Sequence, residues 1–111
     1  RKLDAYNVAL EFQFVAQAVL PFCTSSLRDQ LERAALSILL NVAEGAGRRA
    51  RKDKARFFAI ARGSAFECSA VLDVLYLRGL VAAREYDRGQ RLVTRDQTRN
   101  EIKPSTTTPP A

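Results

Sequence analysis

The fold is decided by residues 27–74, which read LRDQLERAALSILLNVAEGAGRRARKDKARFFAIARGSAFECSAVLDV. The first part of this stretch repeats apolar residues every three or four positions, as a helix with one buried side does. A short segment rich in glycine and arginine follows, and the same periodicity then resumes. These residues predict a helical hairpin, two long helices joined by a basic turn, against which the rest of the chain packs.

The first helix of the hairpin is predicted to begin after Ser26, whose hydroxyl suits a helix N-cap, and to be closed by Gly45 and Gly47 in left-handed conformations. Its predicted buried seam is Leu27, Leu31, Ala34, Ile38 and Val42. Polar residues also recur along it, and buried polar groups need partners. We therefore predict a structural polar network, with a ligand contact as the alternative; its residues are Arg33, Ser37, Asn41 and Glu44, with Arg62 and Glu67 on the second helix.

The second helix of the hairpin is predicted over residues 51–78. Its apolar residues keep a bundle-like spacing of four and three, at Phe57, Ala61, Ser64, Cys68, Val71 and Leu75. The opposite side is hardly more polar, with Ala59, Phe66, Ala70 and Leu77. A helix that is apolar nearly all round has to be covered on more than one side. We therefore expect this protein to form an oligomer.

Two further helices are predicted to flank the hairpin, over residues 2–20, where Pro21 ends the helix, and over residues 84–99. The predicted face of the first is Leu3, Tyr6, Leu10, Phe14 and Ala18, widened by Phe12, Val15 and Val19. The last helix is weak, because its apolar face has only Tyr86, Leu92 and Val93. The fold class is therefore all-α, an antiparallel up-down four-helix bundle over residues 1–102, followed by a disordered tail at 103–111.

The net charge of the 111-residue chain is +6, and residues 48–62 alone carry seven Lys/Arg against one Asp, a local charge of +6. Such a local excess attracts polyanions, although a solvated loop is the alternative. The candidate nucleic-acid-binding residues are Arg48, Arg49, Arg51, Lys52, Lys54 and Arg56. Few aromatic residues are interleaved with them, so we expect recognition of phosphates and shape, with structured RNA as the preferred ligand.

Catalytic chemistry is not indicated by the sequence. The chain has no histidine, the usual general base near neutral pH. Glu44 and Glu67 would resemble a metal-binding bundle if they faced each other, but that design adds Glu-x-x-His ligands. Pairing of these carboxylates with Arg33 or Arg62 is the favoured interpretation. We expect no enzyme activity, no cofactor and no metal.

The cysteines and the lack of a signal peptide or membrane-spanning run predict a cytoplasmic protein. Cys23 and Cys68 lie far from any metal-ligand spacing and are predicted to be reduced thiols, Cys68 as a small buried apolar residue. No signal peptide is seen, and no apolar run reaches the roughly 18–20 residues that cross a bilayer. We expect no membrane association.

Several motifs of the hairpin resemble the "four helix bundle protein" family, which includes proteins encoded in bacterial 23S ribosomal RNA intervening sequences. They cover roughly residues 3–90 and are RDQL at 28–31, RAALSI at 33–38, NVAEG at 41–45, RFF at 56–58, IARGS at 60–64 and Glu67, with LDAY at 3–6. The resemblance implies an antiparallel four-helix bundle that assembles as a ring-shaped homopentamer. Related accessory proteins of diversity-generating retroelements bind nucleic acid and a reverse transcriptase, which gives an adaptor for such a complex as the alternative function.

Two departures from the family pattern affect these expectations. Where the family usually has a helix-capping serine before the second hairpin helix, this chain has Ala50. Loss of a cap costs about 1 kcal/mol. The chain also lacks the leucine-rich end of the last helix, so the family pattern does not define where that helix ends.

Overall fold

The computed structural model describes the backbone of residues 2–99 and the side chains of residues 4–94. The described chain folds into four α-helices and one short 3₁₀ turn. In chain order these are α1 (Lys2–Val19), η1 (Leu20–Phe22), α2 (Ser25–Ala46), α3 (Arg51–Leu77) and α4 (Ala83–Arg99). The predicted tail at 103–111 and the domain limit at residue 102 lie outside the described residues.

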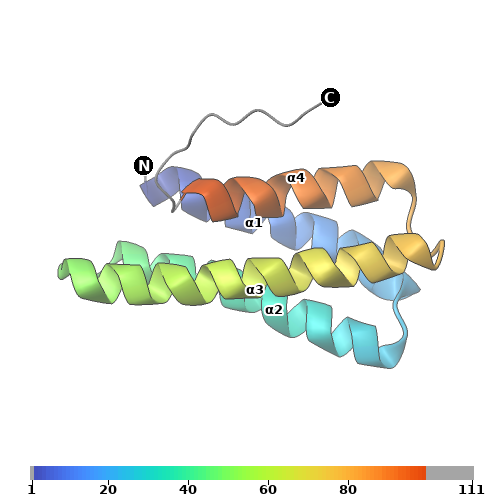
Figure 1. Ribbon diagram of the computed structural model, residues 1–111, viewed down its shortest axis with the longest axis horizontal. Helices are drawn as coiled ribbons and strands as arrows, with labels where there is room; N and C mark the ends of the chain where they lie inside the picture. Colours follow the sequence, from blue (N-terminus) through green and yellow to red (C-terminus); the bar gives the residue numbers. More distant parts are fainter. Residues whose placement is uncertain (1, 100–111) are drawn as a thin grey trace.

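The helices form an antiparallel up-down four-helix bundle, as predicted. Helices α1 and α3 each pack against α2 and α4, so that α1 lies diagonally across the bundle from α3, and α2 from α4 (Figure 1). The α2–α3 hairpin has the most extensive helix–helix contact in the bundle. The α2–α3 turn lies at the end of the bundle where α1 begins and α4 finishes (Figure 1). The basic residues of that turn therefore lie at one end of the fold.

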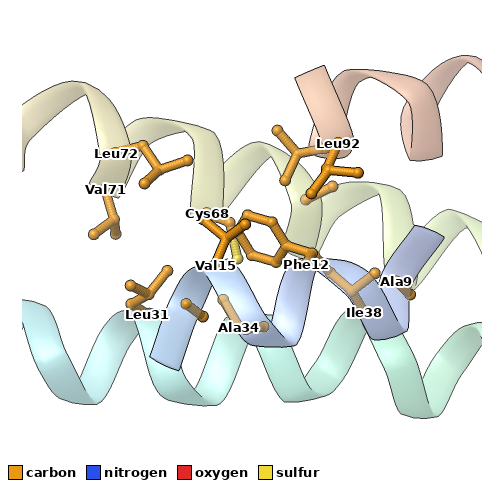
Figure 2. Close-up of a cluster of buried hydrophobic side chains, with 14 of the residues drawn as sticks. Ala9, Phe12, Val15, Leu31, Ala34, Ile38, Cys68, Val71, Leu72 and Leu92 are labelled. Atoms are coloured by element: carbon orange, nitrogen blue, oxygen red, sulfur yellow. The ribbon is translucent and has the colours of Figure 1, made fainter. Parts of the chain in front are cut away.

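The core is a single cluster to which all four helices contribute (Figure 2). The predicted seams of the hairpin are confirmed at their centres, since Leu31, Ile38, Cys68 and Leu75 are fully buried. Leu92 and Val93 are the buried apolar side chains among those described for α4. Burying a large aliphatic side chain stabilises a fold by about 1.5–3 kcal/mol. The long hairpin and its two flanking helices are therefore held together chiefly by apolar packing.

The predicted face of α1 was wrong at Leu10 and Phe14, whereas the residues predicted to widen it are buried. Leu10 and Phe14 are 39% and 68% exposed, whereas Phe12, Val15 and Val19 lie in the core. Helix α1 carries apolar residues on two sides, so its periodicity does not distinguish between them. The buried side is the one on which the large residues alternate with Ala5, Ala9 and Ala16, whose small side chains let α1 approach its neighbours closely.

Two predicted helix ends also differ. Helix α2 begins at Ser25, not after Ser26, because Thr24 is its N-cap and its Oγ1 accepts a hydrogen bond from the backbone N–H of Leu27 at 3.4 Å. At the other end, the predicted left-handed glycines are wrong. Gly45 lies inside α2, and Gly47 caps it with φ −86°. Gly79, which follows α3, does have a positive φ of 71°.

Large apolar side chains remain exposed on three helices and on η1. They are Leu10 and Phe14 on α1, Phe22 in η1, Leu36 and Leu40 on α2, and Ile60, Phe66, Tyr76 and Leu77 on α3. None lies on α4 among its residues with described side chains, 83–94. The predicted apolar outer side of α3 is therefore confirmed at Phe66 and Leu77.

Candidate nucleic-acid interface

The candidate interface is the α2–α3 turn, whose backbone is held by the last turn of α2. The N–H of Gly47 donates to the carbonyls of Ala43 and Glu44, and the N–H of Arg48 donates to the carbonyl of Gly45. Ala50 is the N-cap of α3 and makes no side-chain capping bond, as predicted. The turn is thus anchored on its α2 side and lacks the usual cap on its α3 side.

Phe57 is the centre around which two arginines of the candidate interface gather. The guanidinium carbon of Arg48 lies 4.9 Å from the centroid of the Phe57 ring, and that of Arg56 lies 4.4 Å from it. Each cation is within the range where an aromatic ring attracts it, by about 0.5–1 kcal/mol at exposed sites. Nη2 of Arg48 also lies 3.3 Å from Oε1 of Glu44. Arginines from the two sides of the turn therefore share one aromatic ring.

The approach of this aromatic residue to α2 depends on Gly45. A Cβ built on Gly45 would lie 3.1 Å from the ring of Phe58 and 3.3 Å from Cβ of Phe57. These distances are tighter than ordinary van der Waals contacts, so a side chain here would push the first turns of α3 away. Gly45 is buried for this reason, and its role is close packing at the base of the turn.

The other predicted binding residues surround this centre. Arg49, Arg51 and Lys52 are exposed, as are Arg48 and Arg56. Lys54 is half-buried, and its Nζ donates to the carbonyl of Gly45 at 3.4 Å. Lys54 thus fastens α3 to the end of α2, while the five exposed cations face solvent and can meet the oxygens of a phosphate backbone.

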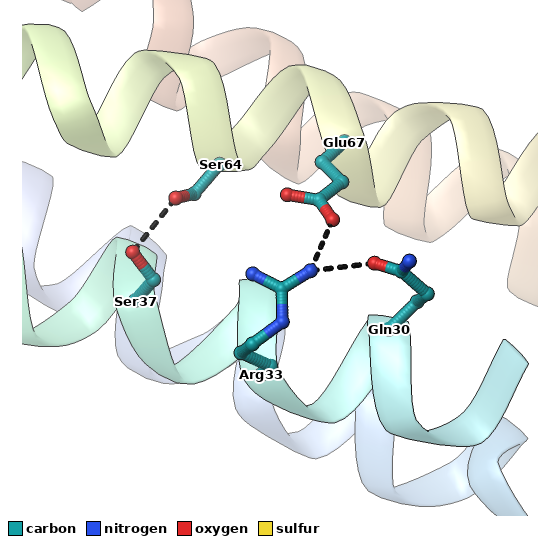
Figure 3. A network of polar contacts seen from close by, with 5 residues as sticks. All are labelled: Gln30, Arg33, Ser37, Ser64 and Glu67. Carbon is teal, nitrogen blue, oxygen red and sulfur yellow. Dashed lines mark hydrogen bonds and ion pairs between the residues drawn. The ribbon is translucent and has the colours of Figure 1, made fainter. Parts of the chain in front are cut away.

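The predicted polar network is a line of contacts between α2 and α3 (Figure 3). Nη2 of Arg33 lies 2.5 Å from Oε2 of Glu67 and donates to Oε1 of Gln30. The Oγ atoms of Ser37 and Ser64 are 2.7 Å apart. One turn further along α2, Asn41 Nδ2 donates to the carbonyl of Ser37 at 2.9 Å.

This network lies nearer the surface than the sequence suggested. The side chains of Arg33 and Glu67 are 62% and 36% exposed, and exposed ion pairs contribute about 0–1 kcal/mol. Arg62 is a half-buried residue of α3. Glu44 pairs with Arg48, whereas Glu67 pairs with Arg33. Glu44 and Arg33 are eleven residues apart on α2, which is about 16 Å along the helix axis. The structure does not bring Glu44 and Glu67 together.

A second polar network, between α3 and α4, was not predicted. The Tyr86 hydroxyl donates to Oδ1 of Asp73 at 2.7 Å, which raises the pKa of Tyr86. Gln90 Nε2 donates to the same carboxylate oxygen, and Ser69 Oγ donates to Oε1 of Gln90. The ring of Tyr86 also stacks on Tyr76, with centroids 4.3 Å apart. The sequence contained one signal for this network, because Ser69 and Asp73 on α3, and Tyr86 and Gln90 on α4, are each four residues apart and so share a helix face.

The two cysteines are free and buried. Burial raises the pKa of the Cys68 thiol to about 12, so the reactive thiolate is scarce at neutral pH. Burial also raises the pKa of Cys23. Among the described side chains, those of residues 4–94, no group of three acidic, cysteine or histidine residues is arranged to hold a metal ion. Within residues 2–99, no helix is long and apolar enough to cross a membrane.

These features define a small helical bundle with a cationic, aromatic-centred turn at one end. The chain belongs to the 23S rRNA-intervening sequence protein family, whose family model matches residues 1–98. Its fold is similar to the crystal structure of a protein of unknown function from the S23 ribosomal protein family of Bacteroides thetaiotaomicron VPI-5482. The TM-score is 0.78 at 20% identity, over 84% of this chain and 91% of the other. No curated protein matches the sequence.

Proposed function

We propose that this protein is a non-enzymatic, oligomeric scaffold that binds structured RNA through its α2–α3 turn. The observation that carries the proposal is the grouping of Arg48 and Arg56 on the ring of Phe57, with Arg49, Arg51 and Lys52 exposed beside them. Arginine is suited to this task because its planar donors meet two phosphate oxygens at once. The name of the family, which refers to a 23S rRNA intervening sequence, makes RNA the first ligand to test.

The turn is suited to phosphates more than to bases. Phe57 is half-buried and already covered by two guanidinium groups, so its ring is not offered to a nucleobase. Single-strand-binding platforms need exposed rings on which bases stack. The expected mode is therefore contact with the backbone of a folded or base-paired RNA, which salt weakens strongly.

The oligomeric part of the proposal rests on the exposed apolar side chains of α2 and α3. Ser37 of α2 and Ser64 of α3 lie opposite each other. About 5 Å closer to the loop between the two helices, Leu40 of α2 and Ile60 of α3 are expected at the same level. Leu36 lies one turn before Leu40 on the same face of α2 and extends this apolar surface. A second copy of the chain would cover it. The homopentamer implied by the family resemblance would place several basic turns on one assembly.

The proposal is tested by comparing two double variants that lose the same charge. Arg49→Ala/Arg51→Ala removes two exposed cations from the turn. Arg28→Ala/Arg78→Ala removes two exposed cations from the opposite end of the bundle, at the start of α2 and just after α3. In a titration of labelled structured RNA, the turn variant should bind at least about tenfold more weakly, and the control should bind like the wild type. An equal loss of RNA affinity in both variants would show that binding depends on the net charge of the protein and not on the turn.

The alternative function is a protein-interaction adaptor, in which the basic turn docks onto an acidic partner such as a reverse transcriptase complex of a diversity-generating retroelement. Exposed apolar residues on α4 would favour it, but the described side chains of α4 include no large exposed one. Purified protein that carries no RNA at low salt and binds none when it is added would favour the adaptor over the scaffold.

A further inference from the structure

Helix α4 carries a second cationic surface, which is separate from the turn. Its five arginines, Arg84, Arg88, Arg91, Arg95 and Arg99, follow one another at spacings of four, three, four and four. Positions with these spacings share one face of a helix. From Arg84 to Arg99 the arginine row runs about 22 Å along the axis. It therefore extends over almost all of α4 (Ala83–Arg99).

This face of α4 is not needed for the core. The helix packs through Gly89, Leu92 and Val93, all buried, and Tyr86 leans toward α3, where it stacks on Tyr76. Arg84, Arg88 and Arg91 are exposed. Whereas α1, α2 and α3 each expose large apolar side chains, the described outer surface of α4 exposes charge instead. In an assembly that covers the exposed apolar side chains of α2 and α3, the outer face of α4 stays free for another ligand.

The charges next to the row only partly neutralise it. Arg88 Nη2 lies 3.4 Å from Oε2 of Glu11 on α1, and Glu85, Asp87 and Asp96 occupy other positions of α4. Five arginines against three carboxylates leave the helix with a net charge of +2. No ion pair involves Arg84 or Arg91 within the part of the chain that the structure describes. These two residues are the ones available to bind an anion.

We infer that the arginine row of α4 is a second contact surface for the phosphate backbone of base-paired RNA. The inference rests on the proposed function and extends it to a second site on the same ligand. Repeated arginines along a straight line match the repeated charge of a polynucleotide. The α4 row leads toward the end of the bundle that carries the basic turn (Figure 1), so one RNA that follows α4 reaches the neighbourhood of both surfaces.

Other ligands fit this surface less well. A helix that lies on a membrane offers its apolar side to the lipid, but Leu92 and Val93 of α4 are buried in the bundle. A single-stranded nucleic acid needs exposed aromatic rings, and Tyr86 is occupied by its stack with Tyr76. Duplex RNA is recognised mainly through its shape, its phosphates and its 2′-hydroxyls, which suits a row of arginines without aromatic residues.

The test uses the full chain and a labelled RNA duplex of about 30 base pairs, titrated over a series of salt concentrations. Arg84→Gln/Arg91→Gln is compared with Arg28→Gln/Arg78→Gln, which removes the same charge from outside both surfaces. We expect the α4 variant to bind about tenfold more weakly near 0.1 M salt, with a salt dependence reduced by about one to two ion equivalents. The control should match the wild type, and circular dichroism should show all proteins equally helical.

Three results overturn the inference. If Arg49→Ala/Arg51→Ala weakens binding and the α4 variant does not, the arginine row is not a contact surface, although the proposed function stands. If the wild type does not bind the duplex, the inference fails, and if it binds no folded RNA either, the proposed function fails as well. If the α4 variant loses affinity for a DNA duplex of the same length as strongly as for RNA, the row recognises phosphates in general and not base-paired RNA.

Discussion

The guanidinium of Arg56 lies over the ring of Phe57, 4.4 Å from its centroid, although the two residues are neighbours in α3. The same ring also attracts Arg48, which comes from the end of α2. Phe57 therefore links the two sides of the basic turn through its π face. This contact limits the freedom of two arginines that would otherwise move independently, and cations that are already positioned lose less entropy when they bind a ligand.

Replacement of Phe57 tests this positioning role. Phe57→Leu keeps an apolar side chain but removes the ring, so Arg48 and Arg56 lose an attraction of about 0.5–1 kcal/mol each. We expect a two- to fivefold loss of RNA affinity, with the net charge unchanged. Phe57→Tyr retains the ring and should restore binding. If leucine and tyrosine bind RNA equally well, the ring has no part in arranging the arginines.

Gly89 is predicted to be the most sensitive glycine of the bundle. A Cβ at this position would lie 2.7 Å from Cδ1 of Leu72 and 3.4 Å from Cγ1 of Val15. Gly89→Ala should therefore lower the free energy of unfolding by about 1–3 kcal/mol, as overpacking of a core does. Urea denaturation followed by circular dichroism measures the change.

The matched control for Gly89 is Gly47→Ala. Gly47 has φ −86°, and a Cβ there would meet only two backbone oxygens at 3.7 Å, an ordinary contact. This substitution should change the free energy of unfolding by less than about 0.5 kcal/mol. A large loss at Gly47 would indicate a left-handed conformation, contrary to the structure.

The apolar surface of α2 and α3 is predicted to join copies of the chain. Leu40 is 54% exposed and lies outside the core, so Leu40→Glu should leave the fold of one chain intact. A buried, unpaired carboxylate at a subunit interface is costly, and light scattering after size exclusion should show a smaller assembly. Phe14→Glu, on the outer side of α1, is the control and should keep the wild-type mass. An unchanged mass for Leu40→Glu would remove this surface from the interface.

Cys68 predicts a dependence of stability on alkaline pH. Burial raises the pKa of its thiol from 9.0 to about 12. Because the folded pKa is raised, the stability linked to this group is complete below pH 9 and is lost as the pH rises from 9 toward 12. Between pH 8 and pH 10 the loss is about 1 kcal/mol. Cys68→Ala lacks this component, so its free energy of unfolding should fall less over the same interval. Parallel losses in the two proteins would contradict the raised pKa.

The sequence was sufficient to predict the fold because the hairpin is strongly periodic. The seam of α3 was correct at Ala61, Cys68, Val71 and Leu75, which follow one another at bundle spacing. The face of α1 was not, because Phe12 and Phe14 both belong to apolar stripes. The stripe of α1 that contains small alanines is the buried one, because only this stripe lets the neighbouring helices approach closely. Gly45 was likewise interpreted from its local propensity, whereas its role is set by Phe58, thirteen residues away.

The candidate site could be located from the sequence but not its internal arrangement. The charge excess at residues 48–62 marks the turn without showing that Arg48 and Arg56 meet on Phe57, or that Lys54 binds the carbonyl of Gly45. The arginine row of α4 was visible as a spacing, but only the fold shows that α4 packs into the core through Gly89, Leu92 and Val93.

The most direct test of the central claim, that the protein binds structured RNA, is a titration of the wild-type protein at two salt concentrations. The probes are a labelled structured RNA, a DNA duplex of matched length and a heparin control. We predict salt-sensitive binding that is tightest for the RNA and clearly weaker for heparin. Equal affinity for all three polyanions, or no binding even at low salt, would contradict the claim that the turn is an RNA-binding surface.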